Sequence, residues 1–486
     1  MNPGLQKPFF LLFLPVFFFL HVLNENFNPV LVTTAFKLIL LYGSISLLLA
    51  LFAWIFFRDL TKAAIFGFAC MAINFFFGLL HDLLIKKIPG SFLVKYSFIL
   101  PFIVLLLLLL VIYLKRTKRH FVRSTKYLNL LLLVLVVLDA VMLVRNIARE
   151  KTQTVADLRN SFTSCDTCSK PDIYLIIADE YAGKQELEDI FSFNNDDFEN
   201  QLKNRGFYVG SNTVSNYNAT AYSMASLLNM DYLHELSSGQ FNYRDMLTCR
   251  NLINKNNTFS FFKEQGYSIY NYSFFDADDK KKAVRNYFYP TNSSLLTFQT
   301  LISRLQRSVG FHLFSGTKIE KIKRNDLYNN QKADSLTKAF AGMQKPGPAF
   351  VYTHLNLPHH GYFYDSTGRI TPLEVLTDEF TMDKQAYTSY LKYSNRKLIE
   401  LVDHIRNNSP KPPVIILLSD HGFRQFPPGS AEKYYFMNLN AVYFPGGDYS
   451  GFYQGISNVN EFRVILNTLF KQRLPLLKDS TSFLVE

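Results

Sequence analysis

VIILLSDHG, the stretch Val414–Gly422, is the part of this 486-residue chain that decides the expected fold. Its first five residues, Val414–Leu418, are apolar without alternation, which is typical of a strand buried on both faces of a parallel sheet. Ser419, Asp420 and His421 follow directly, at the strand end where α/β sheets collect their functional side chains. The stretch therefore predicts a buried strand with a carboxylate and an imidazole at its carboxyl end.

A second stretch has the same pattern. Ile173–Ala178 is apolar throughout and is followed by Asp179 and Glu180. Because the carboxyl ends of parallel strands meet at one edge of a sheet, these acids are expected near Asp420 and His421. Carboxylates and imidazoles are ligands of Zn²⁺ and Mn²⁺, so the two strands together predict a site for a divalent cation. Ordinary hydrogen bonding in loops is the alternative for each pair taken alone.

A possible nucleophile lies between these strands in the sequence. In SNYNATAYSMASLLNM, Ser215–Met230, a polar loop changes into an amphipathic helix at Thr220, which places a hydroxyl at a helix N-terminus, where anions are favoured. A threonine hydroxyl is inert at neutral pH unless a base or a metal activates it. The alternative is that Thr220 only caps the helix.

Three histidines form another candidate group. HLNLPHHGY, His354–Tyr362, follows an apolar strand that begins at Ala349. His359 or His360 could donate to a phosphoryl oxygen or protonate a leaving group. Surface histidines beside a proline turn are the alternative.

Apolar residues make up 48% of the chain and concentrate before residue 146. Runs near the roughly 20 residues needed for one bilayer crossing predict five spans in residues 1–145. These are Pro8–Leu23, Leu38–Phe57, Ala63–Leu84, Tyr96–Leu114 and Tyr127–Val144.

The net charge of +12 is best explained by membrane topology, and no nucleic-acid partner is expected. Its densest cluster lies between the fourth and fifth spans and marks that loop as cytoplasmic, although three lysines in the preceding loop oppose this. The N-terminus is then inside and everything after Arg145 outside the cytoplasm. The cluster comprises Lys115, Arg116, Lys118, Arg119, Arg123 and Lys126.

Few polar residues interrupt the spans. Asn74, His81 and Asp82 lie in the third span and Asp139 in the fifth. Ionisable groups inside a membrane are functional candidates, as part of a proton path or a lipid-headgroup path, although groups near the interface can also reach water.

The rest of the chain predicts an α/β domain. A polar connector, residues 146–170, precedes residues 171–486, in which strand-like runs alternate with helical patterns, so we expect a mostly parallel central sheet flanked by helices. The charged segment 298–344 is expected to be a helical insertion. Cys165 and Cys168 favour a local disulfide because a second pair for a zinc ribbon is missing.

Taken together, IIADEYAG, NYNATAYSMASLL, LNLPHHGYFYD and IILLSDHG resemble the alkaline phosphatase/sulfatase superfamily in their order and spacing. They are similar to its membrane-anchored branch, which includes lipoteichoic acid synthases and lipid A phosphoethanolamine transferases. That resemblance implies an alkaline-phosphatase-like catalytic domain behind a five-helix transmembrane bundle, in the cell (inner) membrane and facing away from the cytoplasm. It implies one Mn²⁺ or Zn²⁺ held by Glu180, Thr220, Asp420 and His421, with Asp179 as a further candidate ligand.

The same resemblance implies a mechanism. Thr220 would attack the phosphate of a membrane phospholipid donor, with His359 at the substrate phosphate, and pass the group to an envelope lipid or glycan acceptor or to water. His354 and His360 are further candidates for substrate binding, and we expect a monomer.

The sequence also departs from the family pattern. Thr220 stands where sulfatases carry a Cys or Ser that becomes formylglycine, which disfavours sulfate ester hydrolysis. No histidine follows His421, which disfavours a second complete metal site; Arg424 or Lys433 is the candidate replacement for that missing donor. A hydrolase without acceptor transfer and a non-catalytic binding or sensory module therefore stay open as alternatives.

Overall fold

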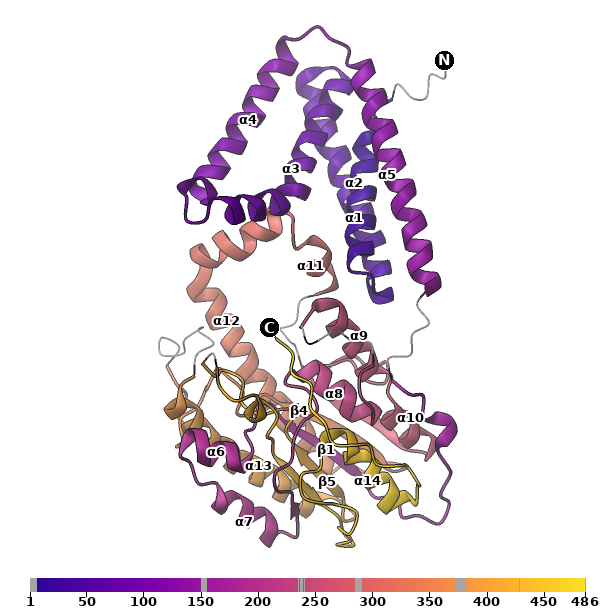
Figure 1. Ribbon diagram of the computed structural model, residues 1–486, viewed down its shortest axis with the longest axis vertical. Helices are drawn as coiled ribbons and strands as arrows, with labels where there is room; N and C mark the ends of the chain where they lie inside the picture. Colours follow the sequence, from indigo (N-terminus) through magenta and orange to yellow (C-terminus); the bar gives the residue numbers. More distant parts are fainter. Residues whose placement is uncertain are drawn as a thin grey trace. The chain divides into compact units, whose positions relative to one another are not determined.

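The computed structural model describes residues 7–149, 155–234, 236, 239, 241–284, 291–372, 382–427 and 429–485, without the side chains of residues 149, 243 and 308–326. The chain divides into two compact units (Figure 1). The first unit, called the membrane unit after the spans expected above, comprises Met1–Thr152 and Phe288–Lys318. The second, called the catalytic unit after the activity expected above, comprises Gln153–Tyr287 and Ile319–Glu486.

Five apolar helices form most of the membrane unit: α1 (Phe10–Glu25), α2 (Pro29–Phe57), α3 (Leu60–Lys87), α4 (Tyr96–Arg116) and α5 (Val122–Arg149). Asn28 and Asp59 are the N-cap residues of α2 and α3. Their side chains accept hydrogen bonds from backbone N–H groups of the first turn.

Four of these helices, α2 to α5, are long and apolar enough to cross a membrane. Helix α1 has 16 residues, which at about 1.5 Å per residue falls short of a hydrocarbon core of about 30 Å. The prediction of five spans is therefore supported for four helices. The span expected at Pro8–Leu23 corresponds to α1.

A six-stranded sheet forms the core of the catalytic unit. Its order is β2-β6-β5-β1-β4-β3, and among the described strands β6 alone runs against the others. The prediction of a mostly parallel sheet is therefore confirmed. The strands are β1 (Ile173–Ala178), β2 (Tyr208–Val209), β3 (Ser268–Tyr272), β4 (Ala349–Leu355), β5 (Val414–Leu418) and β6 (Asn440–Tyr443).

Helices cover both faces of this sheet. One face packs against α8 (Thr220–Asn229), α10 (Asn257–Glu264) and α14 (Asn458–Phe470); Phe350 of β4, for example, contacts Phe259 of α10 and Phe462 of α14. The opposite face packs against the last turns of α12 (Leu301–Ala341), where Phe340 contacts Tyr270 and Tyr174, and against α13 (Lys384–Asn408). Because β1, β4 and β5 are covered on both sides, they carry the continuous apolar runs visible in the sequence.

The remaining helices are α6 (Lys184–Phe191), α7 (Asp196–Asn204), α9 (Tyr243–Asn254) and α11 (Asn292–Thr297). The expected insertion, 298–344, is helical, but its first part groups with the membrane unit and only the rest with the catalytic unit. The connector expected at 146–170 begins inside α5, and its residues 150–154 lie outside the described residues. Cys165 and Cys168 are joined by a disulfide.

Candidate active site

The register of three neighbouring strands brings the predicted acids and histidines together. Ile177 of β1 pairs with His354 of β4 and with Leu418 of β5, so these three side chains point to the same face of the sheet. Asp179 lies two residues after Ile177, and Asp420 lies two residues after Leu418, so both side chains point to that same face. The result is a buried group, Asp179, His354 and Asp420, whose ligand atoms all lie within 4.8 Å of one another.

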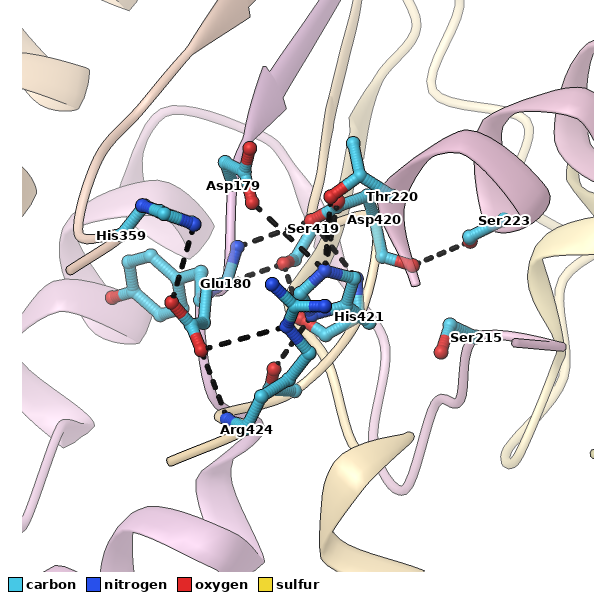
Figure 2. Close-up of polar contacts among 12 residues, drawn as sticks. Asp179, Glu180, Ser215, Thr220, Ser223, His359, Ser419, Asp420, His421 and Arg424 are labelled. Carbon is cyan, nitrogen blue, oxygen red and sulfur yellow. Dashed lines mark hydrogen bonds and ion pairs between the residues drawn. The ribbon is translucent and has the colours of Figure 1, made fainter. Parts of the chain in front are cut away.

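Thr220 and His421 complete this group (Figure 2). Thr220 is the first residue of α8, which covers the same face, and its Oγ1 lies 3.1 Å from His421 Nε2. Nε2 is also 3.2 Å from an Asp420 oxygen and 4.0 Å from an Asp179 oxygen. His421 Nδ1 lies 2.8 Å from the Gly422 carbonyl, which can only accept, so Nδ1 carries the proton and the Nε2 lone pair faces the cluster.

The donor set fits a divalent cation. Asp179 Oδ1, His354 Nε2 and Asp420 Oδ2 are buried and lack a partner with hydrogen-bond geometry among the described residues. They do have close ionic neighbours: His354 Nε2 lies 3.3 Å from Asp179 Oδ2, and His421 Nε2 lies 3.2 Å from Asp420 Oδ2. Burial would raise the pKa of Asp179, but the neighbouring imidazoles, His359 foremost, lower it below its usual value. Burial and the charge of Asp179 raise the pKa of Asp420. Two facing carboxylates and two imidazoles are the ligand types that Zn²⁺ and Mn²⁺ take in proteins.

Glu180 lies on the other side of the strand end. Consecutive residues of an extended chain point to opposite faces, and Glu180 also has a φ of 61°. Its carboxylate accepts a hydrogen bond from the Arg424 N–H at 2.9 Å (Figure 2). It accepts another from the Gln425 side chain at 2.7 Å. The structure thus separates the Glu180 carboxylate from Thr220, with which the sequence had grouped it, and places Asp179 there instead.

Two predicted cationic residues lie against Glu180. His359 Nε2 is 3.8 Å and Arg424 Nε 3.9 Å from the Glu180 carboxylate oxygens. Asp179 and Glu180 together raise the pKa of His359 against the opposing effect of burial. The backbone N–H of His360 donates to Glu180 at 3.4 Å. Glu180 therefore holds together the two loops that carry His359 and Arg424.

The comparison with protein families decides the identity of this domain. The family model described as Sulfatase matches residues 171–462. The chain belongs to the sulfatase family. The predicted resemblance to the superfamily is thereby confirmed, and the apolar helices that precede this sulfatase-family domain give the chain the architecture expected for the membrane-anchored branch.

No curated protein matches the chain. Among solved structures, the sulfatase-family chain is similar to the lipooligosaccharide phosphoethanolamine transferase A (EptA) from Neisseria meningitidis, at 12% identity and a TM-score of 0.40 over 98% of this chain and 97% of that one. It is also similar to the C-terminal periplasmic domain of EcEptC from Escherichia coli, at 10% identity and 0.40 over 66% and 91%. For the corresponding domain of phosphoethanolamine transferase EptC from Campylobacter jejuni, the values are 15% and 0.36 over 64% and 92%.

Sequence reasoning assigned some residues of this sulfatase-family site to other roles and missed others. His354 was expected near the substrate but lies in the cluster with Asp179 and Asp420; the strand register would have shown this once β4 was known to pair with β1. Ser223, one turn into α8, donates to the Asp420 carbonyl at 2.5 Å, and Gln425 holds Glu180. No local pattern marks these two residues, because their roles depend on contacts between distant segments.

Proposed function

We propose that this protein is a metal-dependent phosphotransferase of the cell envelope that uses Thr220 as its nucleophile on a phospholipid headgroup. The convergence of Asp179, His354, Asp420 and His421 around the Thr220 hydroxyl carries this proposal. These residues would hold one Mn²⁺ or Zn²⁺, which, when bound, would neutralise the carboxylates and lower the pKa of the threonine hydroxyl.

The residues of this chain then have distinct roles. Thr220 Oγ1 loses its proton to solvent and attacks phosphorus. The bond from phosphorus to the diacylglycerol oxygen breaks, so diacylglycerol leaves with a proton and Thr220 carries the headgroup phosphate as a phosphothreonine. The N-terminus of α8 favours negative charge at this position, because its first N–H groups have no intrahelical acceptor. His359 and Arg424 supply positive charge to the phosphate oxygens. An envelope lipid or glycan acceptor takes the phospho-group in the second half of the reaction.

Membrane helices in the same chain support a lipid donor, because attachment to the bilayer raises the effective concentration of such a substrate. With the basic loop after α4 on the cytoplasmic side, the domain that follows α5 lies outside the cytoplasm. This placement, in the inner membrane with an extracytoplasmic catalytic domain, is part of the proposal.

A labelled donor tests the function. Full-length protein in vesicles containing headgroup-labelled phosphatidylethanolamine and phosphatidylglycerol is incubated with Mn²⁺ or Zn²⁺, and the peptide that contains residue 220 is analysed by mass spectrometry. We expect a phosphorylated adduct on Thr220, its retention in Thr220→Ser, and its loss in Thr220→Ala. Headgroup release without an adduct or an acceptor product would favour a hydrolase. Equal behaviour of Thr220→Ala and wild type would contradict the proposal.

A further inference from the structure

Three residues of α3 form a polar stripe inside the membrane unit. Asn74, Gly78 and Asp82 are spaced by four and therefore lie on one face of the helix. Each contacts the segment Gln299–Arg304. This segment lies between two strands of the catalytic sheet in the sequence but belongs to the membrane unit in the structure. Two of the polar residues noted in the third predicted span, Asn74 and Asp82, thus have partners in this distant segment.

The contacts along the stripe are specific. Asn74 Oδ1 accepts from the Ile302 N–H at 3.3 Å, and the Gly78 N–H donates to the Gln299 carbonyl at 2.9 Å. Arg304 forms a two-pronged ion pair with Asp82, at 2.7 and 2.6 Å, in which Arg304 is mostly buried. Such paired guanidinium–carboxylate contacts are among the stronger hydrogen bonds in proteins.

The close approach depends on Gly78. A Cβ at this position would overlap both the carbonyl oxygen and the side-chain oxygen of Gln299. Gln299 is fixed in turn by Arg304, which donates to its side-chain oxygen at 2.5 Å. The glycine allows Gln299–Arg304 to approach α3 closely, and the polar residues four positions before and after it bind the same segment.

The other side of this segment is suited to lipid. Phe298 and Ile302 are 42% and 51% exposed, and the Arg307 guanidinium lies 3.6 Å from the centre of the Phe298 ring. Residues 291–307 contain two arginines and no acidic residue. Leu79 and Leu80 of α3, the helix that this segment contacts, are also exposed. An aromatic ring beside a basic side chain, next to lipid-facing leucines, is typical of the bilayer interface.

The segment continues into the catalytic unit through one helix. Helix α12 begins at Leu301 and ends at Ala341. Near its end, Asn330 exchanges two hydrogen bonds with the backbone of Asn356, at 3.0 and 2.7 Å, and Thr337 bonds to Thr353 at 2.7 Å. Asn356 lies three residues before His359. The helix that begins at the membrane segment therefore ends against the chain that carries the site histidines.

We propose that residues 291–307 form a membrane clamp: a segment, inserted between two strands of the catalytic sheet, that the C-terminal half of α3 holds against the bilayer and whose exposed face binds phospholipid. Arg307 faces lipid phosphate, while Phe298 and Ile302 contact the acyl chains. The clamp gives the chain that forms the catalytic unit a second attachment to the membrane, in addition to α5. Its consequence for catalysis, preferential action on a donor embedded in the bilayer, rests on the proposed function.

Fluorescence quenching tests the clamp without reference to activity. Full-length Phe298→Cys protein, with Cys70 and Cys249 replaced by Ala, is labelled with an environment-sensitive dye and placed in phosphatidylglycerol vesicles that contain spin-labelled lipid. We expect strong quenching of the dye. Arg304→Ala should shift the equilibrium between a clamp bound to α3 and a clamp detached from it about tenfold toward the detached state. This should reduce the quenching, because the substitution removes a charge-assisted hydrogen bond.

Two further variants complete this test. The exchange Asp82→Arg with Arg304→Asp should restore the quenching, because it rebuilds the ion pair. Arg205→Ala is the matched control, since it removes a similar two-pronged pair with Asp403 in the catalytic unit and should leave the quenching unchanged. An unquenched dye in the parent protein, or equal quenching in Arg304→Ala and Arg205→Ala, would overturn the clamp.

Activity measurements test the consequence. Arg304→Ala should lower turnover of the vesicle-embedded phospholipid about tenfold and leave turnover of a water-soluble nitrophenyl phosphate ester unchanged, with recovery in the charge exchange. Equal loss on both substrates, or loss on neither, would contradict the role in donor access. If the wild-type protein acts on neither substrate, the proposed function fails, whereas the quenching result still decides the clamp.

Discussion

Replacing Asp179 and Glu180 one at a time should separate two adjacent acids that the sequence cannot distinguish. Asp179 faces His354, Asp420 and the Nε2 atom of His421, and one of its oxygens has no hydrogen-bond partner among the described residues. The Glu180 carboxylate instead accepts from Arg424 and Gln425. Under the proposed assignment, Asp179→Asn removes a metal ligand, whereas Glu180→Gln disturbs only the loops around the site.

The expected magnitudes follow from these positions. Loss of an outer-shell partner usually lowers metal affinity 10–100-fold, so loss of a direct ligand should lower it at least about 100-fold, or about 2.7 kcal/mol. A cation at about 1,000 times its dissociation constant stabilises the folded state by about 4.1 kcal/mol, of which about 1.4 should remain in Asp179→Asn. Because the neighbouring imidazoles also stabilise the Asp179 carboxylate, the contribution of the cation is taken for each variant as the difference in stability with and without metal.

Calorimetric titration of chelator-treated, detergent-solubilised protein with Mn²⁺ and Zn²⁺ measures the affinity, and thermal unfolding with and without metal measures the stabilisation. We expect Glu180→Gln to bind within about tenfold of wild type and to lose turnover more than affinity. Wild-type affinity in Asp179→Asn, or an equal loss in both variants, would refute the assignment of these two acids.

Three further outcomes are expected. Burial raises the pKa of Glu461 to about 7, so the folded state should lose about 3 kcal/mol as the pH rises from 4.5 to 7; Glu461→Gln should flatten this dependence in denaturant titrations, and an unchanged slope would contradict it. Ser223→Ala leaves the buried Asp420 carbonyl without its 2.5 Å donor and should cost about 1–3 kcal/mol of stability, whereas a neutral result would mean that this bond is dispensable. Arg424→Ala should lower turnover of the phospholipid donor, and Arg424→Lys should recover only part of it, because lysine lacks the planar fork; full recovery would show that charge alone suffices.

Much of the fold could be predicted because its signals are local. The apolar runs at Ile173–Ala178 and Val414–Leu418 became β1 and β5 with the expected bounds, since strands covered on both faces need apolar side chains at every position. The change from a polar loop to a helix at Thr220 was equally visible, and α8 begins at that residue.

The details of the site depended on information that the sequence does not carry locally. Whether Asp179 or Glu180 faces Thr220 is set by strand register, and a shift of one residue exchanges the two. His354 could be placed beside Asp179 only by knowing that β4 pairs with β1. The stripe Asn74–Gly78–Asp82 likewise acquires a meaning only through Gln299–Arg304, more than 200 residues later in the chain.

Anomalous X-ray diffraction from crystals of the full-length protein grown with Mn²⁺ tests the central claim most directly. We expect one anomalous peak about 2.0–2.3 Å from ligand atoms of Asp179, His354, Asp420 and His421, with the Thr220 hydroxyl oriented toward it. A peak coordinated by the Glu180 carboxylate and not by Asp179, or a metal bound elsewhere with Thr220 facing away, would contradict the account.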